Sequence, residues 1–239
     1  MPRFFTQEVD AATARITGPD AVHIARVLRM RPGEQITVCD LAGSDYLCEI
    51  LSAKSDAVDL RVLEQRPTVA EPTVHVTLFQ GLPKADKMEL IVQKSVELGV
   101  SRIVPVLTAR CVSRPDKAVM AKKTERWRKI ALEAAKQSGR GKLPRVDDTM
   151  GFTEAVQELG QMERGILFYE KGGDAHRDLW SGAREIGVCI GPEGGFADEE
   201  VALAVRAGAH ICTLGPRILR TETAPLCVLS VVMYATGNL

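Results

Sequence analysis

The pattern of apolar and polar positions divides the chain into two parts. Up to about residue 65, short β-rich runs alternate with turn signals such as RPGE and LAGSD, which predicts a small β-barrel module. One short helix, PDAVHIARVLRM, interrupts these runs with apolar positions at helical spacing. The following segment, QRPTVAEPT at residues 65–73, breaks both periodicities and is predicted to be a linker.

From Val74 onward, buried strands alternate with helices. The predicted strands are VHVTLFQGL, RIVPVLTAR, GILFYE, EIGVCIG and HICTLG. Helices are predicted within 84–100, from about 116 to 138, near 152–160, from 198 to 208 and from about 223 to 236. This alternation predicts an α/β fold with a mostly parallel sheet and helices on both faces. We therefore expect two domains, at residues 1–68 and 74–239.

The basic residues of the chain are concentrated around the predicted helix at 116–138, although the net charge of the whole chain is zero. The chain carries 31 basic and 31 acidic residues, yet residues 110–145 hold twelve Lys or Arg against three Asp or Glu. An apolar stripe that includes Met120 and Trp127 is expected to be buried, which leaves basic side chains on another side of the helix. Such a stripe is typical of phosphate contact, with an ordinary solvated helix face as the alternative.

Cysteine and histidine usage gives no sign of a metal site. The six cysteines and four histidines are dispersed, with no Cys-x-x-Cys pair, so we expect reduced core cysteines and no metal. The chain has no signal-peptide pattern and no apolar run of about 18 residues. We therefore expect a cytoplasmic protein with no membrane partner.

Two loops with glycine follow predicted strands. They are GPEGGF after EIGVCI and the LGPRILRTETAPL segment after HICT, and loops at the carboxyl ends of parallel strands form the usual ligand crevice. GPEGGF lacks the ending of a phosphate-binding Walker A loop, and Glu193 would repel a polyphosphate. A neutral or cationic ligand is therefore favoured. A simple tight turn in the first loop, and a helix cap at Thr221 or Thr223 in the second, are the alternatives.

Several motifs carry a family resemblance. GPEGGF, LGPRILRTETA, KADKMELIVQKSVELGV and the opening MPRFF with HIARVLRMRPGE resemble the RsmE family, bacterial 16S ribosomal RNA uracil-N3 methyltransferases of the SPOUT class. The resemblance spans essentially the whole chain. It implies a PUA-like RNA-binding β-barrel domain followed by a SPOUT domain with a C-terminal trefoil knot, one of the rare exceptions to unthreaded topology. It also implies a homodimer that acts on the small ribosomal subunit.

The resemblance further implies a site for S-adenosyl-L-methionine at the carboxyl ends of the strands. Carried over by position, this cofactor site comprises Leu167, Phe168, Glu170, Gly191, Pro192, Glu193, Gly194, Leu214, Gly215, Ile218, Leu219, Arg220, Thr221, Glu222, Thr223 and Ala224. A sulfonium donor with a neutral adenine suits backbone donors and acceptors better than a lysine cradle.

Catalysis at uracil N3 needs loss of the N3 proton and stabilisation of the resulting anion. We assign anion stabilisation to Arg220, and to Glu222 either proton acceptance or the anchoring of Arg220. These roles could be exchanged with Arg3 or another arginine of the barrel. The expected RNA contacts are Arg3, Arg26, Arg29, Arg31, Arg110, Arg114, Lys122, Lys123, Arg126, Arg140 and Lys142.

Two other classes of function stay open at this point. A non-catalytic RNA-binding or ribosome-assembly factor would keep the barrel and the basic stripe but would not bind the methyl donor. A nucleotide-phosphate enzyme would use GPEGGF as an anion loop, although the Lys and Ser/Thr partners of such a loop are missing.

Overall fold

The computed structural model describes residues 1–174 and 179–239, and this part of the chain forms two compact units. Unit 1 consists of residues 1–71 together with residues 135–143, and unit 2 consists of residues 72–134 and 144–239. The predicted second domain began at residue 74 and included 135–143, whereas these residues belong to unit 1. The end of the long basic helix is therefore part of the first unit.

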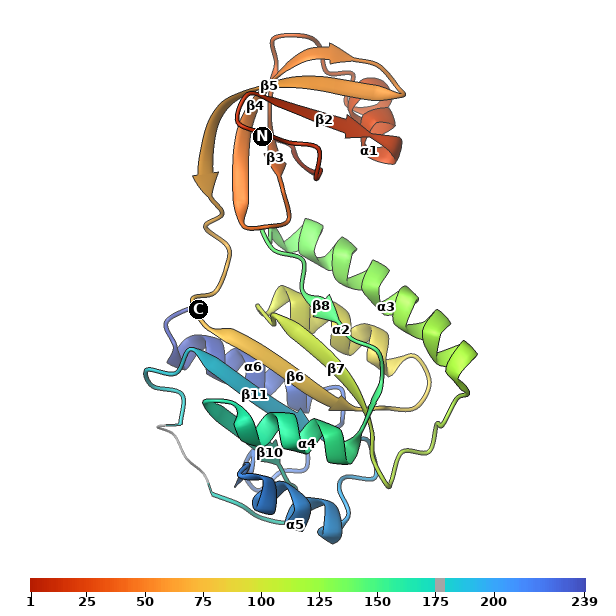
Figure 1. Ribbon diagram of the computed structural model, residues 1–239, viewed down its shortest axis with the longest axis vertical. Helices are drawn as coiled ribbons and strands as arrows, with labels where there is room; N and C mark the ends of the chain where they lie inside the picture. Colours follow the sequence, from red (N-terminus) through yellow and green to blue (C-terminus); the bar gives the residue numbers. More distant parts are fainter. Residues whose placement is uncertain (175–178) are drawn as a thin grey trace. The chain divides into compact units, whose positions relative to one another are not determined.

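Unit 1 is built on one curled sheet (Figure 1). The sheet has the strand order β1-β3-β4-β5-β2, with β1 parallel to β3 and the other neighbours antiparallel. Its elements are β1 (Arg3–Phe5), β2 (Thr13–Thr17), α1 (Gly18–Val22), the π-helical turn η1 (His23–Val27), β3 (Gln35–Cys39), β4 (Ser44–Ala53) and β5 (Ala57–Pro67). The predicted β-rich module with one short helix is confirmed.

The core of unit 1 explains how a strand-rich sequence accommodates this helix. Alternate residues of β2, such as Ala14 and Ile16, are buried, whereas their neighbours are exposed. This alternation is the pattern of a sheet with one face against the core. Ile24 of η1 is fully buried in the same cluster, so the helical turn packs against the buried face of the sheet.

Glu71 ends the first segment of unit 1 and binds the second. Its carboxylate accepts hydrogen bonds from Arg140 Nε at 2.9 Å and Nη2 at 3.0 Å, and from the amides of Gly141 and Lys142. Burial alone would raise the pKa of Glu71, but these bonds and the Arg140 charge outweigh it and hold the pKa below its ordinary value. The predicted linker, residues 65–73, thus contains one member of a largely buried ion pair.

We expect Glu71→Gln to lower the free energy of unfolding by about 3 kcal/mol at pH 7, because it removes the charge that compensates the buried Arg140 guanidinium. The wild-type carboxylate stabilises the fold above the unfolded pKa of about 4.3, and this contribution disappears as the pH falls through the lower folded pKa. Urea denaturation between pH 7 and pH 3 measures the difference, with Glu64→Gln as an exposed control in the same unit. A difference that does not shrink in acid would contradict an ionic origin.

Unit 2 contains a parallel sheet with the strand order β12-β10-β11-β6-β7-β8, in which β9 also pairs with β7. Its elements are β6 (His75–Gly81), α2 (Lys87–Glu97), β7 (Arg102–Leu107), α3 (Lys117–Ser138, whose last turn belongs to unit 1), β8 (Arg145–Val146), β9 (Met150–Gly151), α4 (Phe152–Gln161), β10 (Arg164–Phe168), β11 (Glu185–Ile190), α5 (Asp198–Ala207), β12 (His210–Cys212) and α6 (Ala224–Ala235).

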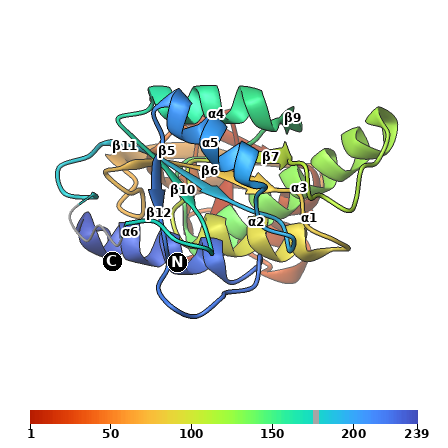
Figure 2. The same cartoon turned by 90° about the horizontal axis from the view of Figure 1, so that it is seen from below.

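The helices of unit 2 cover both faces of this sheet, as predicted. Figure 2 shows α4 and α5 on one side of the strands and α2 and α6 on the other. Strand β6 is buried from Val76 to Gly81, which explains why most of this stretch is apolar, with Thr77 and Gln80 as its polar residues. On α4, the buried residues Phe152, Ala155 and Val156 recur at helical spacing.

Two boundaries in the predicted elements are wrong for tertiary reasons. Residues 65–67 belong to β5 because they pair with Ser44, Asp45 and Tyr46 of the long neighbouring strand. The HICTLG strand ends at Cys212, and residues 213–215 leave the sheet. The result is that β10, β11 and β12 all end at one edge, where the chain turns into loops.

Candidate functional site

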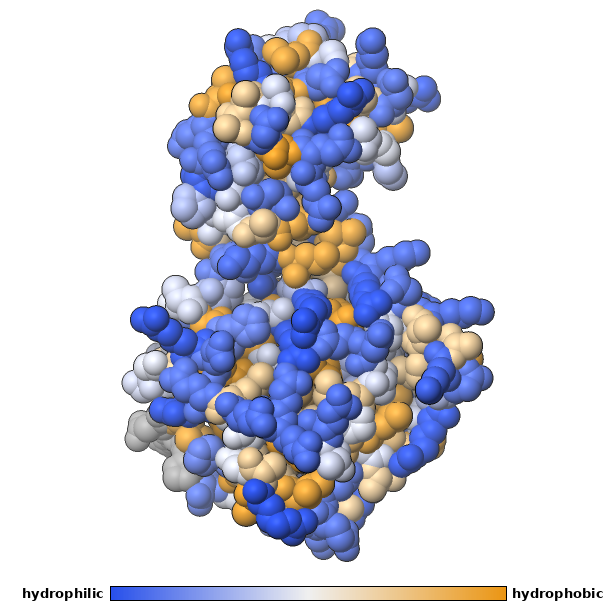
Figure 3. Space-filling view, viewed as in Figure 1, coloured by the Kyte–Doolittle hydropathy of each residue, from blue (hydrophilic) through white to orange (hydrophobic). Residues whose placement is uncertain are grey.

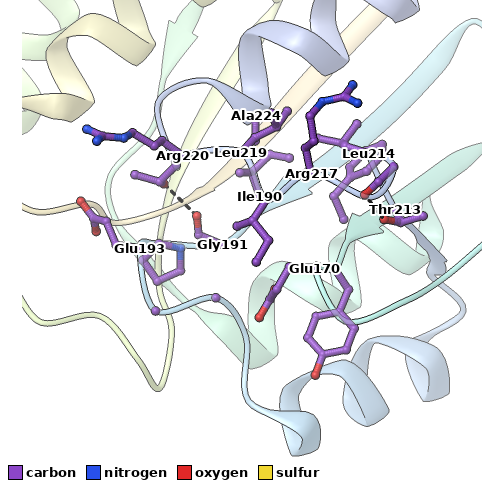
Figure 4. A pocket seen from close by; sticks show the side chains of 18 of the residues that line it. Glu170, Ile190, Gly191, Glu193, Thr213, Leu214, Arg217, Leu219, Arg220 and Ala224 are labelled. Atoms are coloured by element: carbon purple, nitrogen blue, oxygen red, sulfur yellow. Dashed lines mark hydrogen bonds between the residues drawn. The ribbon is translucent and has the colours of Figure 1, made fainter.

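A cavity of about 520 Å³ lies at the carboxyl ends of β10, β11 and β12 in unit 2 (Figure 4). The loops that follow these three strands supply most of its wall, and α2 supplies one side chain. The lining residues are Lys87, Phe168, Tyr169, Glu170, Ile190, Gly191, Pro192, Glu193, Gly194, Gly195, Thr213, Leu214, Gly215, Arg217, Ile218, Leu219, Arg220, Thr221 and Ala224. This is the position where open parallel sheets bind ligands.

The loop after β11 depends on glycine in two ways. Gly195 has φ +64°, a left-handed conformation that glycine adopts without steric cost. A Cβ at Gly81, at the end of the neighbouring β6, would lie 2.6 Å from Pro192 Cδ and 2.7 Å from Pro192 N. The GPEGGF loop therefore packs directly against the backbone of β6, which fixes one wall of the cavity.

Thr221 joins this loop to the one that follows β12. Its Oγ1 donates to the carbonyl oxygen of Gly191 at 2.8 Å and accepts from Gln80 Nε2 at 3.2 Å. Gln80 is fully buried and Thr221 is 5% exposed, so both bonds are protected from water. The hydroxyl thus binds two loops that lie 30 residues apart in the sequence.

Lys87 carries a second connection between the same loops. Its Nζ lies 3.1 Å from Glu193 Oε1 and 3.0 Å from Glu222 Oε2, and the hydrogen bond to Glu222, followed by that to Glu193, raises the lysine pKa. Burial opposes ionisation of Glu222, but the hydrogen bond from Lys87 and the charges of Lys87 and Arg220 outweigh it and keep the Glu222 pKa below its ordinary value. Glu222 is therefore a weak base in this arrangement.

Arg220 occupies the rim of the cavity and is exposed. In Figure 4 its side chain lies on the same side as Glu193, whereas Glu170 lies on another wall. The contact partner of the Glu222 carboxylate is Lys87, while Arg220 acts on it through its charge. The arginine head is thus available to a ligand.

The structure brings most of the expected cofactor residues together. Thirteen of them line the cavity: Phe168, Glu170, Gly191, Pro192, Glu193, Gly194, Leu214, Gly215, Ile218, Leu219, Arg220, Thr221 and Ala224. Leu167 lies in the core of the sheet instead, because its side chain is fully buried among the residues under α4. Thr223 and Glu222 are not part of the wall.

Thr223 also bears on the helix-cap interpretation of this segment. It occupies the N-cap position of α6, so a threonine does precede the last helix, but its side chain makes no capping hydrogen bond. Its backbone is already helical, with φ −90° and ψ −38°, whereas a capping residue has extended backbone. The other threonine, Thr221, is bonded to Gly191 and not to the helix start.

Six lining residues were not assigned to the cofactor site by the sequence: Lys87, Tyr169, Ile190, Gly195, Thr213 and Arg217. Ile190 and Thr213 immediately flank the assigned motifs, so the motif boundaries excluded them. Lys87 lies more than 100 residues before the Gly-rich loop, but it opens the helix after β6, whose carboxyl end meets the same sheet edge. Its position at that edge is the signal that could have identified it.

Several of the expected RNA-contact residues have partners within their own unit. In unit 1, Arg140 is 3% exposed and bound to Glu71, so its side chain is not offered to a ligand. Arg3 is ion-paired with Asp45 at 2.8 Å and also donates to the carbonyl oxygen of Arg140. These two arginines differ from the other candidates in their burial and their local hydrogen bonds. A count of charges along the sequence does not contain this information.

In unit 2 as well, some of the expected RNA-contact residues have local partners among the described residues, and others do not. Arg110 Nη1 donates to the carbonyl oxygen of Gly194 at 3.0 Å and thereby supports the Gly-rich loop. Arg114 binds the carbonyl oxygen of Thr108, and Arg126 is ion-paired with Glu89 while most of its side chain stays exposed. The remaining candidates are exposed or half-buried: Arg26, Arg29, Arg31, Lys122, Lys123 and Lys142.

No group of three or more His, Cys, Asp or Glu side chains in 1–174 and 179–239 is placed to hold a metal ion. No helix in this part of the chain combines the length and apolar character needed to cross a membrane.

Comparison with known proteins places the chain in one family. An RNA methyltransferase domain model matches residues 70–233, and an RNA methyltransferase PUA domain model matches residues 16–63. Ribosomal RNA small subunit methyltransferase E of Bacillus subtilis is 39% identical, over 99% of this chain and 97% of its own length. The protein of the same name from Mycobacterium tuberculosis is 34% identical over 95% of this chain and 88% of its own.

A solved structure gives the same result in three dimensions. The small subunit methyltransferase E of Neisseria gonorrhoeae, bound to S-adenosyl methionine, is 33% identical with a TM-score of 0.84, over 98% of this chain and 97% of that one. The matches in sequence, domain order and structure cover both units. The chain therefore belongs to the RNA methyltransferase family whose members are named ribosomal RNA small subunit methyltransferase E.

Proposed function

We propose that this protein transfers a methyl group from S-adenosyl-L-methionine to N3 of one uridine in the 16S ribosomal RNA of the small ribosomal subunit. The observation that carries the proposal is the cavity at the strand ends of the methyltransferase domain, built by the loops that hold the family motifs. A related protein with 33% identity has a structure with S-adenosyl methionine bound. Because the substrate is ribosomal, we also propose that the enzyme acts in the cytoplasm.

The residues of the cavity fit this donor. A volume of about 520 Å³ lies within the range of small-molecule sites, and the wall combines apolar side chains with the backbone of Gly191–Gly195 and Leu214–Gly215. The close approach of Gly81 to Pro192 is a cradle that a Cβ would disturb. Glu170 and Glu193 add carboxylates, which suit a cationic sulfonium and oppose a polyphosphate. The nucleotide-phosphate alternative is therefore disfavoured.

When bound, the donor supplies an electrophilic methyl group, and the remaining tasks belong to side chains of this chain. We assign to Arg220 the stabilisation of the negative charge that develops when uracil N3 loses its proton. Its guanidinium is always charged, and it lies on the exposed rim where a base can enter. The lowered pKa of Glu222 favours the second of its two expected roles, the anchoring of the Arg220 turn, over proton acceptance.

Each unit offers exposed basic residues for the RNA backbone. In unit 1, Arg26, Arg29 and Arg31 are exposed around η1, and in unit 2 Lys122 and Arg126 are exposed on α3. Figure 3 shows a mostly hydrophilic face with smaller apolar areas between the polar residues. Phosphate contacts of this kind position the RNA, while the uridine must be extruded to expose N3.

We further propose that the protein is a homodimer through α6. This helix is apolar on all sides, and Cys227, Val231 and Tyr234 form an exposed stripe at helical spacing, with Tyr234 77% exposed. A helix that is apolar all round is normally buried on all sides. Leu90 of the adjacent α2 extends the apolar surface, and a second copy of the chain would cover it. The trefoil knot implied by the resemblance stays a prediction.

The dimer proposal makes a specific prediction for Val231→Glu. A charge in the middle of the apolar stripe would have to be buried on association, so we expect the dimer dissociation constant to rise at least tenfold. Analytical ultracentrifugation measures it, with Val205→Glu on the opposite layer, at α5, as the matched control. A wild-type protein that stays monomeric at micromolar concentration would refute the proposal.

The function itself is tested on small ribosomal subunits from bacterial cells that lack this protein. After incubation with the protein and the donor, we expect mass mapping to show one added methyl group on one uridine. Since N3 lies on the pairing edge of the base, reverse transcription should stop at the same nucleotide. Donor binding without methylation of any uridine would favour the non-catalytic assembly factor.

A further inference from the structure

Lys87 is the one charged side chain of α2 in the wall of the cavity. It is the first residue of the helix, and its side chain is about one-third exposed. Its Nζ contacts one carboxylate from the loop after β11, at Glu193, and one from the loop after β12, at Glu222. One ammonium group thus connects three segments of unit 2 that are remote in the sequence.

Glu193 has a second attachment to the same part of the fold. Both of its carboxylate oxygens accept from the backbone amide of Lys84, at 3.2 and 3.3 Å, in the turn that leads into α2. The N-cap residue Asp86 makes no side-chain capping bond, and Ala85 in this turn has φ +53°. The Gly-rich loop and the start of α2 are therefore held against each other through Glu193.

Glu222 depends on Lys87 more strongly than Glu193 does. Lys87 forms the ion pair with Glu222. The other charged groups beside this ion pair are Glu193, from the Gly-rich loop, and Arg220, from the same turn as Glu222. Two carboxylates that share one ammonium group would repel each other without it. Removal of the Lys87 charge would therefore favour protonation of Glu222 or its withdrawal from this position.

We propose that Lys87 is a positioning residue for methyl transfer: by binding Glu193 and Glu222 together, it fixes the turn that presents Arg220 at the rim of the cavity. Glu222 follows Arg220 by two residues, so a displaced Glu222 carries the Arg220 backbone with it. The ion pair acts together with the Thr221 hydroxyl, which binds the same turn to Gly191. This inference rests on the proposed methyltransferase function.

The test compares Lys87→Met, which keeps the length of the side chain but not its charge, with Lys87→Arg, which keeps the charge. Lys94→Met is the matched control, because Lys94 lies on the same helix and is ion-paired with Glu97 away from the cavity wall. For each full-length protein, single-turnover methylation of small subunits is measured between pH 5 and pH 8. The pKa of Glu222 is followed by carboxyl carbon NMR.

For Lys87→Met we expect a single-turnover rate about 10- to 100-fold below wild type at pH 7. The pKa of Glu222 should rise, and the acid limb of the rate profile should move to higher pH, because the positive charge that lowers this pKa is lost. Lys87→Arg should recover the rate to within a few-fold of wild type. Lys94→Met should match wild type in all three measurements.

The outcomes separate this inference from the proposed function. If wild type methylates the subunit and Lys87→Met has the same rate and pH profile, the inference is wrong and the function stands. A slower Lys87→Met whose Glu222 pKa and acid limb do not move also overturns it, since a general loss of structure would explain that result. If wild type transfers no methyl group, the proposed function itself fails.

Discussion

Replacement of Arg220 by Ala should reduce the single-turnover methylation rate about 100- to 1000-fold, while the affinity for the methyl donor changes by only a few-fold. This is the size of effect found when a single preorganised group that stabilises a developing anion is removed. Arg220 is exposed at the rim, so its loss should cost little stability. Rapid-quench assays with labelled donor measure the rate, and calorimetry measures donor binding.

Two further variants sharpen this expectation. Arg220→Lys keeps a positive charge but loses the planar guanidinium fork, so it should fall between wild type and Arg220→Ala. Arg206→Ala removes an exposed arginine near the end of α5, outside the cavity wall, and serves as the control. A rate for Arg220→Ala near that of wild type would exclude Arg220 as the group that stabilises the uracil anion.

The second large effect is expected for Gly81→Ala, which should weaken donor binding about 10- to 100-fold. The added Cβ would lie 2.6–2.7 Å from atoms of Pro192 and 3.0 Å from the carbonyl carbon of Gly191, so the Gly-rich loop must shift. Overpacking of this kind typically costs about 1–3 kcal/mol. Because the displaced atoms are the wall of the cavity, we expect the cost to appear in donor affinity measured by calorimetry.

Gly151→Ala provides the control for Gly81→Ala. A Cβ at Gly151 would meet nothing within 4 Å, and the position lies before α4 in the same unit. Donor affinity should therefore stay at the wild-type level. Unchanged affinity in Gly81→Ala would show that the loop yields without loss of function and that its backbone position is not set by β6.

Much of the fold could be predicted because its elements have strong local signals. The helix α4 has four buried residues at helical spacing, and β6 is a short, mostly apolar run of strand length, so period and length suffice to identify both. Strands β1, β8 and β9 are not predicted, because each has only two or three residues and no periodic pattern of its own, whereas β12, also three residues long, is predicted as part of the longer run HICTLG. They exist because neighbouring strands offer free hydrogen-bonding edges.

The sequence predicted most of the cavity wall but did not predict which of the expected side chains are buried elsewhere. The family resemblance supplies the expected cofactor residues, and thirteen of them line the cavity, most of them in the two loops that follow β11 and β12. The Leu167 side chain lies outside the cavity wall because the alternation of side chains along a strand decides which residue faces the core, and a motif does not contain this information. Arg140 was expected at the RNA because a charge count does not reveal burial or a partner such as Glu71.

By itself, the sequence determined the succession of elements, the division into a β-rich part and a parallel α/β part, and the two loops that carry the family motifs. These properties are local, because periodicity, turn residues and glycines act over a few positions. Only the tertiary structure decided that Lys87 meets Glu193 and Glu222, and that Thr221 joins Gly191 to Gln80. Contacts of this kind depend on the order of parallel strands, which brings residues from distant segments to one sheet edge.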